Sequence, residues 1–148
     1  MNVNIQSCLT PLIPSDSVRP VSTTVCELAA NQATYDKKLV RVSGVVESDG
    51  MEYENLIDVQ CPHVGTDLGL SEAIRKKKTV AKLQTAIYKA NPIGTKSLKI
   101  TATVLGIFRA SNGHDPRSIA VESIENLKIE HWDSRQTKPW MDFGPPPD

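Results

Sequence analysis

Three cysteines and three histidines are the side chains in this sequence best suited to nucleophilic or metal chemistry. Cys61 and His63 flank Pro62, and two metal ligands can come from such a pair. A protein metal site needs three or four donors, however, and no further donor stands at a workable spacing. His114 and Asp115 are of the right types for an acid–base pair, although a solvated loop is the commoner outcome. We therefore expect no metal and no cofactor.

The motifs that organise catalytic and nucleotide-binding sites are absent from the sequence. It contains no Gly-x-Ser-x-Gly, no His-Glu-x-x-His, no phosphate-binding loop and no dinucleotide-binding glycine run. Cys26 is near a predicted helix start, but its neighbours are apolar, whereas reactive thiolates have exposed, electropositive surroundings. We predict no catalytic residue and a protein that is not an enzyme.

Two clusters of opposite charge are our candidates for binding a partner. The basic cluster consists of Arg75, Lys76, Lys77 and Lys78, and the acidic cluster consists of Glu47, Asp49, Glu52 and Glu54. A solvated helix face is the commoner fate of such a basic run. Together, however, the two clusters predict a surface polarised by sign, which suits a charged protein partner better than a nucleic acid.

The C-terminal tail supplies two further candidates, Trp140 and Phe143, beside three consecutive prolines. Large aromatic side chains are seldom left in water, so we expect this tail to bind a surface. Two alternatives stay open: the tail binds its own domain, or it binds another chain.

The composition disfavours nucleic acid and membranes as partners. Seventeen basic and seventeen acidic side chains give a formal net charge of zero, so no overall field attracts polyanions. Aromatic residues make up 5% of the chain, which is few for a protein that stacks bases. The sequence has no apolar run of the roughly 18 residues that a membrane-spanning helix needs.

Local patterns predict a bent pair of strands behind a short helix. Thr24 and Glu27 have the spacing of a capping box, and Asn31 is suited to end the helix. Residues 39–46 and 56–61 alternate apolar and polar side chains, as half-buried strands do. Gly44 interrupts the first strand, as at a bulge or a barrel corner.

The second half of the chain adds a long helix and further strands. Residues 67–70 suit a short third strand, and residues 71–90 carry apolar side chains at helical spacing. Residues 98–108 predict the longest strand, with Gly106 near its end as Gly44 is in the first. Residues 118–121 and 127–131 predict two more extended pieces. Five strands with a helix between the third and fourth predict an OB-like barrel, and a small α+β sheet is the alternative.

The pattern from Cys26 through Tyr35-Asp36-Lys37-Lys38 and Val40-Arg41-Val42-Ser43-Gly44 to Cys61-Pro62 resembles a group of small exported bacterial proteins, most of them uncharacterised. Those proteins share a cysteine-bearing helix, a Val-x-Val-x-Gly strand and a second cysteine, and they resemble OB-fold domains. Lys37 stands where they have glycine. The likeness covers residues 23–129 and implies the fold and export, but no catalytic residue.

The resemblance also implies a disulfide between Cys26 and Cys61, with Cys8 outside the fold. The predicted facing agrees with this, since Cys61 would end a strand on the inward side set by Ile57 and Val59. The alternative is three reduced cysteines in a cytosolic protein.

These observations predict three segments: a poorly ordered arm at residues 1–22, one OB-like domain at 23–131 and a Trp- and Pro-rich tail at 132–148. We expect a non-enzymatic binding module that acts through protein contacts, periplasmic or otherwise exported, with the cytoplasm as the alternative. One concrete form is an immunity protein that neutralises a toxin. The alternative function is an OB-type nucleic-acid or oligosaccharide binder.

Overall fold

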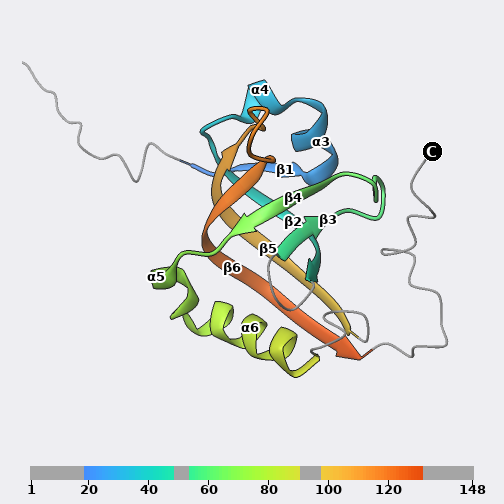
Figure 1. The fold of residues 1–148 in the computed structure, drawn as a ribbon, viewed down its shortest axis with the longest axis vertical. Helices are drawn as coiled ribbons and strands as arrows, with labels where there is room; N and C mark the ends of the chain where they lie inside the picture. The colour runs from blue at the N-terminus through green and yellow to red at the C-terminus, as the bar shows by residue number, and fades with distance from the viewer. Residues whose placement is uncertain (1–18, 49–53, 91–97, 132–148) are drawn as a thin grey trace, which may run out of the picture.

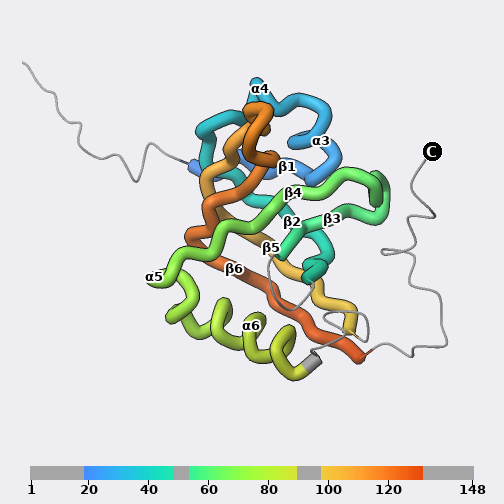
Figure 2. Tube along the Cα trace, viewed as in Figure 1, coloured from blue at the N-terminus to red at the C-terminus, as the bar shows by residue number. Residues whose placement is uncertain are grey.

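The computed structural model describes residues 19–48, 54–90 and 98–131, which form a β-barrel with helices at both ends (Figure 1). In chain order, the elements are β1 (Val21–Thr24), α3 (Val25–Ala30), α4 (Gln32–Tyr35), β2 (Leu39–Ser48), β3 (Glu54–Ile57), β4 (Gly65–Gly69), α5 (Glu72–Arg75), α6 (Lys78–Ala90), β5 (Leu98–Arg109) and β6 (Ser118–His131). Figure 2 follows the chain from β4 through α5 and α6 and back into the barrel as β5.

Five strands close the barrel in the order β2, β3, β4, β6 and β5, because β5 pairs again with β2. The β4–β6 pair is parallel, and the other pairs of the closed barrel are antiparallel. β1 is an additional strand that pairs in parallel with β2. This order, with α6 between the third and fourth barrel strands, confirms the predicted OB-like architecture.

Gly44 marks the point at which one edge of β2 changes its partner. Before it, Val40–Ser43 pair with β1, and after it, Val45–Ser48 pair with β3. A Cβ atom at Gly44 would lie 2.5 Å from the carbonyl oxygen of Ile57, so the glycine allows the two strands to approach closely.

Gly106 plays a similar part in the antiparallel pair of β5 and β6. The register shifts between Leu105 and Gly106, and a Cβ atom at Gly106 would lie 2.2 Å from the carbonyl oxygen of Ala120. The irregularity predicted at this glycine is therefore confirmed, and its cause is close backbone approach.

Helices close the two ends of the barrel core. At one end, Thr24 caps α3 by accepting a hydrogen bond from the Glu27 amide at 3.0 Å, and Val25 and Leu28 are fully buried. The reciprocal half of the predicted capping box is replaced, because the Glu27 carboxylate accepts from Asn31 Nδ2 at 3.3 Å. At the other end, α6 contributes buried apolar side chains to the same core: Val80, Leu83 and Ile87.

The single helix predicted over residues 71–90 is divided into α5 and α6. Ser71 caps α5 by accepting a hydrogen bond from the Ile74 amide at 3.2 Å, and α5 ends at Arg75 with Lys76 as its C-cap. At the junction, Lys77 Nζ donates to the carbonyl oxygen of Glu122 on β6 at 2.7 Å. This contact holds the junction between α5 and α6 against β6. Because it joins residues far apart in sequence, sequence periodicity cannot predict it.

The return strand predicted over residues 56–61 was wrong at its C-terminal end. β3 ends at Ile57, and the Asp58 carboxylate accepts a hydrogen bond from the Gln60 amide at 2.8 Å, which turns the chain. Val59, expected on the inward face, is 49% exposed. The alternation of apolar and polar residues over 56–61 is typical of a strand. The hydrogen bond from the Gln60 amide to the Asp58 carboxylate forms a turn there instead.

Four other features also differ from the predictions. Val21 and Ser22, assigned to the N-terminal arm, belong to β1, and the short helix α4 was not predicted. β4 begins at Gly65, and β6 runs continuously from Ser118 to His131 where two pieces were expected. The last difference follows from pairing, since bulges let β6 keep its ladder with β5 along its whole length.

Candidate functional site

A row of polar side chains crosses the outer face of the barrel. Strand register aligns Glu47 of β2 with Asn55 of β3, Asn55 with Asp67 of β4, Asp67 with Ser118 of β6, and Ser118 with Arg109 of β5. Residues opposite one another on paired strands project from the same face of a sheet. We call Glu47, Asn55, Asp67, Ser118 and Arg109 the polar row.

A cavity of about 490 Å³ opens beside the Asp67, Ser118 and Arg109 part of this row. Its wall also includes Glu54, at the start of β3, and Arg75 of α5. Pockets of this size accommodate small ligands or a few partner side chains. The lining combines carboxylate and guanidinium groups, so the cavity suits an occupant that presents both charges.

The β5–β6 loop that borders the cavity is held in place by hydrogen bonds. Asn112 Oδ1 accepts from the amides of His114 at 3.0 Å and Asp115 at 2.8 Å, and Gly113 has a φ of 92°. At the start of the loop, the Ala110 amide donates to the Asp36 carboxylate at 2.9 Å. The loop is therefore a fixed wall of the cavity.

Arg117 joins the end of this loop to β4. Its Nε donates to the carbonyl oxygen of Gly65 at 2.8 Å, and its own carbonyl oxygen accepts from the Asp67 amide at 3.2 Å. Burial raises the pKa of the Asp67 carboxyl above its ordinary value of 3.8, and the Arg117 charge offsets part of this rise. Asp67 is thus a partly desolvated carboxyl that a donor from a partner would stabilise.

Among the described residues, Asn55 contains a buried acceptor without a donor, and Arg109 contains an exposed cation without an ion pair. Asn55 Oδ1 is buried, with no hydrogen-bond donor in the described part of the chain. Arg109 is exposed, and within the described ranges its guanidinium has no carboxylate within 4.0 Å. A buried amide oxygen without a donor costs stability, and functional surfaces are where such groups are kept.

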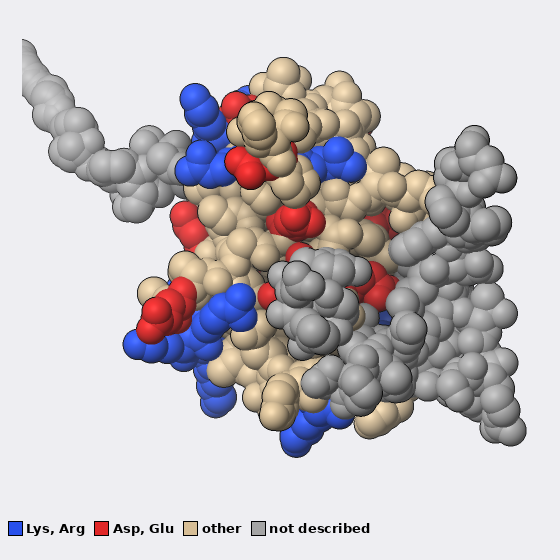
Figure 3. Space-filling model, viewed as in Figure 1, with Lys and Arg blue, Asp and Glu red and all other residues tan. Residues whose placement is uncertain are grey.

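Of the predicted acidic cluster, Glu47 and Glu54 lie in the described residues, and Asp49 and Glu52 lie outside them. Glu47 belongs to the polar row and is only 7% exposed. Glu54 lines the cavity, its side chain is 11% exposed, and its Oε1 is 3.9 Å from Arg75 Nη2. Glu54 is therefore in contact with the basic cluster, so the expected separation of the two signs does not hold here. Figure 3 shows acidic and basic side chains interleaved on this face.

The basic cluster divides into anchored and solvated side chains. Arg75 Nε donates to the carbonyl oxygen of Leu70 at 3.1 Å, and its Nη1 also contacts Gln84 Oε1. Lys77 is bound to β6, as described above. Lys76 and Lys78 are exposed on the junction and on α6. Arg75 alone of these four lines the cavity.

The predicted disulfide between Cys26 and Cys61 is present, with 5.8 Å between the Cα atoms. The pairing is confirmed, but the facing argument behind it was wrong, because Cys61 lies in the turn after β3. The Cys61 amide donates to the carbonyl oxygen of Asp58 at 3.0 Å, and this turn presents the sulfur to α3. Trp140 and Phe143 lie outside the described residues.

Reasoning from the sequence missed Asn55, Asp67, Ser118 and Arg109. Each is an ordinary polar residue at a strand position, and no motif links them. Only strand register brings them into one row, and register is a long-range property.

In comparisons with known proteins, no protein-family model matches this chain, and no curated protein sequence matches it. None of the helices in the described ranges is long and apolar enough to cross a membrane. In the same ranges, no group of three or more His, Cys, Asp or Glu side chains has the arrangement of a metal site.

Proposed function

We propose that this protein is a non-enzymatic, exported binding module that holds a protein partner against the outer face of β3 and β4. The observation that carries the proposal is the polar row beside the cavity. Asn55 lacks a donor, Asp67 is partly desolvated and Arg109 has no ion pair in the described part of the chain. A protein surface supplies donors and acceptors at several points at once and satisfies such a row better than one small ligand.

The lining of the cavity favours a protein over a single-stranded nucleic acid. Nucleic-acid binders combine a positive groove with aromatic side chains on which bases stack. The aromatic residues of the described ranges are Tyr35, Tyr88 and Phe108, and none of them lines this cavity. The cavity also carries carboxylates, which repel a phosphate backbone.

The disulfide supports the exported part of the proposal. Disulfide bonds persist in oxidising compartments and are rare where thiols are kept reduced. In a bacterium, this compartment would be the periplasm. One concrete form of the function is an immunity protein, in which the polar row meets complementary charges of a toxin and blocks it.

The test compares two charge-reversal variants of the row, Asp67→Lys and Arg109→Glu, with two matched reversals elsewhere. The controls are Lys78→Glu on α6 and Glu122→Lys on β6, both exposed and away from the cavity. Tagged proteins capture partners from the native host, and mass spectrometry identifies them. We expect one protein to be held by the wild type and both controls and lost from both row variants.

The captured protein is then purified, and its binding is measured by calorimetry at low and high salt. Truncating or reversing one charge of a buried interfacial pair costs about 2–5 kcal/mol, so each row variant should weaken binding at least tenfold. Equal binding of the partner by the row variants and the control variants would show that the partner does not bind at the polar row. Tight, strongly salt-dependent binding of single-stranded DNA that the row variants abolish would favour the alternative function instead.

A further inference from the structure

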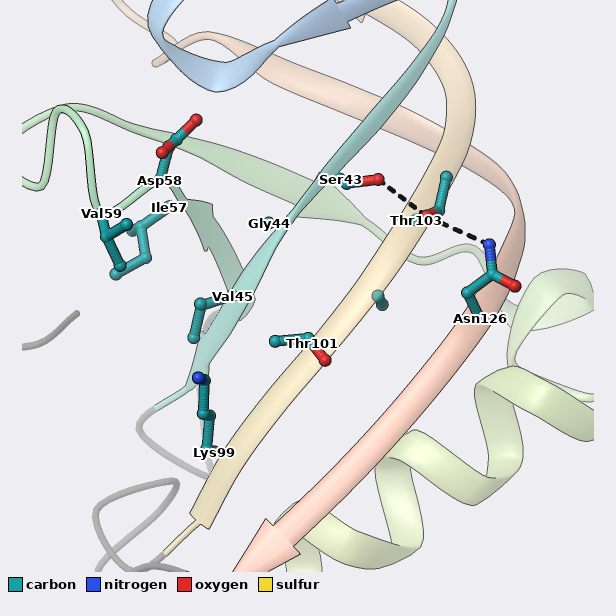
Figure 4. Close-up of a pocket in the computed structure, with 11 residues that line it drawn as sticks. Ser43, Gly44, Val45, Ile57, Asp58, Val59, Lys99, Thr101, Thr103 and Asn126 are labelled. Atoms are coloured by element: carbon teal, nitrogen blue, oxygen red, sulfur yellow. Dashed lines mark hydrogen bonds between the residues drawn. The ribbon is translucent and has the colours of Figure 1, made fainter.

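A second cavity, of about 410 Å³, lies on the outer face of β2 and β5, next to the Glu47–Asn55 end of the polar row and away from Asp67, Ser118 and Arg109 (Figure 4). Its floor is made of short side chains, Ser43, Thr101 and Thr103. Ser43 Oγ and Thr103 Oγ1 are 2.8 Å apart, and Asn126 Nδ2 donates to Thr103 Oγ1 at 3.5 Å. The Ser43, Thr103 and Asn126 side chains hydrogen-bond with one another. An occupant of the groove would therefore find space there but few free hydrogen-bonding groups.

One wall of this groove is apolar. It consists of Val45, its cross-strand partner Ile57, and Val59 in the turn after β3. Val59 is one of the few large apolar side chains of the described residues that are strongly exposed, at 49%. Figure 4 shows Ile57 and Val59 side by side at the edge of the groove. A floor of short side chains, in which the Ser43 and Thr103 hydroxyls pair with each other, beside an apolar wall suits a large apolar or aromatic side chain.

Opposite charges stand at the two ends of the apolar wall. Figure 4 shows Asp58 at one end and Lys99 at the other, with the three apolar side chains between them. An occupant with an aromatic residue flanked by a cation and an anion would match the groove in shape and charge.

The chain itself contains such a segment within reach. Residues 138–143 read Lys-Pro-Trp-Met-Asp-Phe, so Trp140 has Lys138 on one side and Asp142 on the other. In an extended chain these three side chains project from the same side, and Lys138 and Asp142 are about 13 Å apart. The groove has the complementary order, with the anion Asp58, then the apolar wall, then the cation Lys99.

The position at which the chain leaves the barrel favours this occupant. His131, the last residue of β6, pairs with Leu98, whose neighbour Lys99 lines the groove. An extended chain covers at most about 3.3–3.6 Å per residue, so Trp140 can lie up to about 30 Å from His131. Along β5, Lys99 and Thr103 are only about 13 Å apart. The whole groove is therefore within reach.

We propose that residues 138–143 of this chain bind in the groove of the same molecule, with Trp140 against Val45, Ile57 and Val59. Lys138 then faces Asp58, and Asp142 faces Lys99. This inference stands on the groove and on the sequence of the tail, and it does not depend on the function proposed above.

Tryptophan fluorescence tests the proposal in the full-length chain. The chain has two tryptophans, so Trp132→Phe leaves Trp140 as the sole reporter. In this background we expect Trp140 to emit at shorter wavelength, and to be quenched by acrylamide several-fold less, than in a free peptide of residues 132–148. Thr101→Arg fills the floor of the groove and should shift both readings to those of the peptide.

Two controls locate the contact. Ala86→Arg blocks a different groove, between α6 and the ends of β5 and β6, and should leave Trp140 protected. Lys138→Glu should release Trp140 by placing a carboxylate beside Asp58, and adding Asp58→Asn, which keeps an oxygen to accept from the Gln60 amide, should restore much of the protection. Asp58 does not belong to the core of the described residues, so this pair gives a result even if Thr101→Arg does not fold.

Three outcomes would overturn the proposal. The first is Trp140 fluorescence like that of the free peptide in the parent protein. The second is release by Ala86→Arg and not by Thr101→Arg, which would place the tail in the other groove. The third is protection that disappears on dilution, which would mean that the tail binds a second copy of the chain.

Discussion

Cys26 on α3 is bonded to Cys61 in the turn after β3, so the disulfide ties the helix at one end of the barrel to the β3–β4 connection. The same turn carries Asp58 and Val59, which form a wall of the groove on β2 and β5. The bond therefore stabilises the fold and also holds one side of a surface groove in position.

Replacing both bonded cysteines by serine should lower the free energy of unfolding. The bond closes a loop of 35 residues, and a loop of this length stabilises by roughly 3–4 kcal/mol through the restricted unfolded chain. Urea denaturation measures the loss, and Cys8→Ser is the control that should change nothing. Intact-mass analysis after alkylation without reductant should find one free thiol per chain, and three would contradict the bond.

Gly106→Ala should destabilise the barrel, because its Cβ would lie 2.2 Å from the backbone oxygen of Ala120, which cannot rotate away. Forcing extra atoms into such a contact costs about 1–3 kcal/mol. Gly69→Ala is the matched control, since its Cβ would lie 3.4 Å from the nearest atom, the carbonyl oxygen of Ile119. Thermal unfolding compares Gly106→Ala with Gly69→Ala. Equal melting temperatures would mean that the contact between β5 and β6 at Gly106 is looser than described.

Thr66→Val should stabilise the protein by about 1 kcal/mol, because a buried hydroxyl without a partner is penalised. Thr66 is fully buried, and its Oγ1 has no hydrogen-bond partner within the described residues. Thr103→Val is the contrasting variant, since it removes a hydroxyl that lies 2.8 Å from Ser43 Oγ and should destabilise. The denaturant midpoints of the two variants measure these changes in stability. A loss of stability in Thr66→Val would show that the Thr66 hydroxyl has a partner in solution.

Asp67 should make stability depend on pH in a defined direction. Burial raises the pKa of its carboxyl above 3.8, and Arg117 offsets part of that rise. The folded state then holds the proton more tightly than the unfolded chain, so stability falls as pH rises from about 3.8 through the folded pKa. Asp67→Asn lacks this fall and should gain on the wild type over that window. Parallel curves for the two proteins between about pH 3 and about pH 7 would contradict it.

Local sequence was sufficient to predict the architecture. Alternation around Val40 and Val42, the cap at Thr24 and the glycines at 44 and 106 act over a few residues, and each has the predicted role. Such signals specify strands, helix starts and close approaches because they depend on neighbouring side chains and backbone conformation. Where a local signal was ambiguous, as at Val59, the hydrogen bond from the Gln60 amide to the Asp58 carboxylate decided against the strand.

The candidate site depends on tertiary structure. Asn55, Asp67 and Arg109 are far apart in sequence, and they form one row only because β2, β3, β4, β6 and β5 pair in a particular register. A shift of one residue in any of these pairs would turn the side chains to the opposite face. Charge clusters read along the chain therefore predicted Glu54 and Arg75 as separate patches, whereas the closed barrel places them 3.9 Å apart on one cavity.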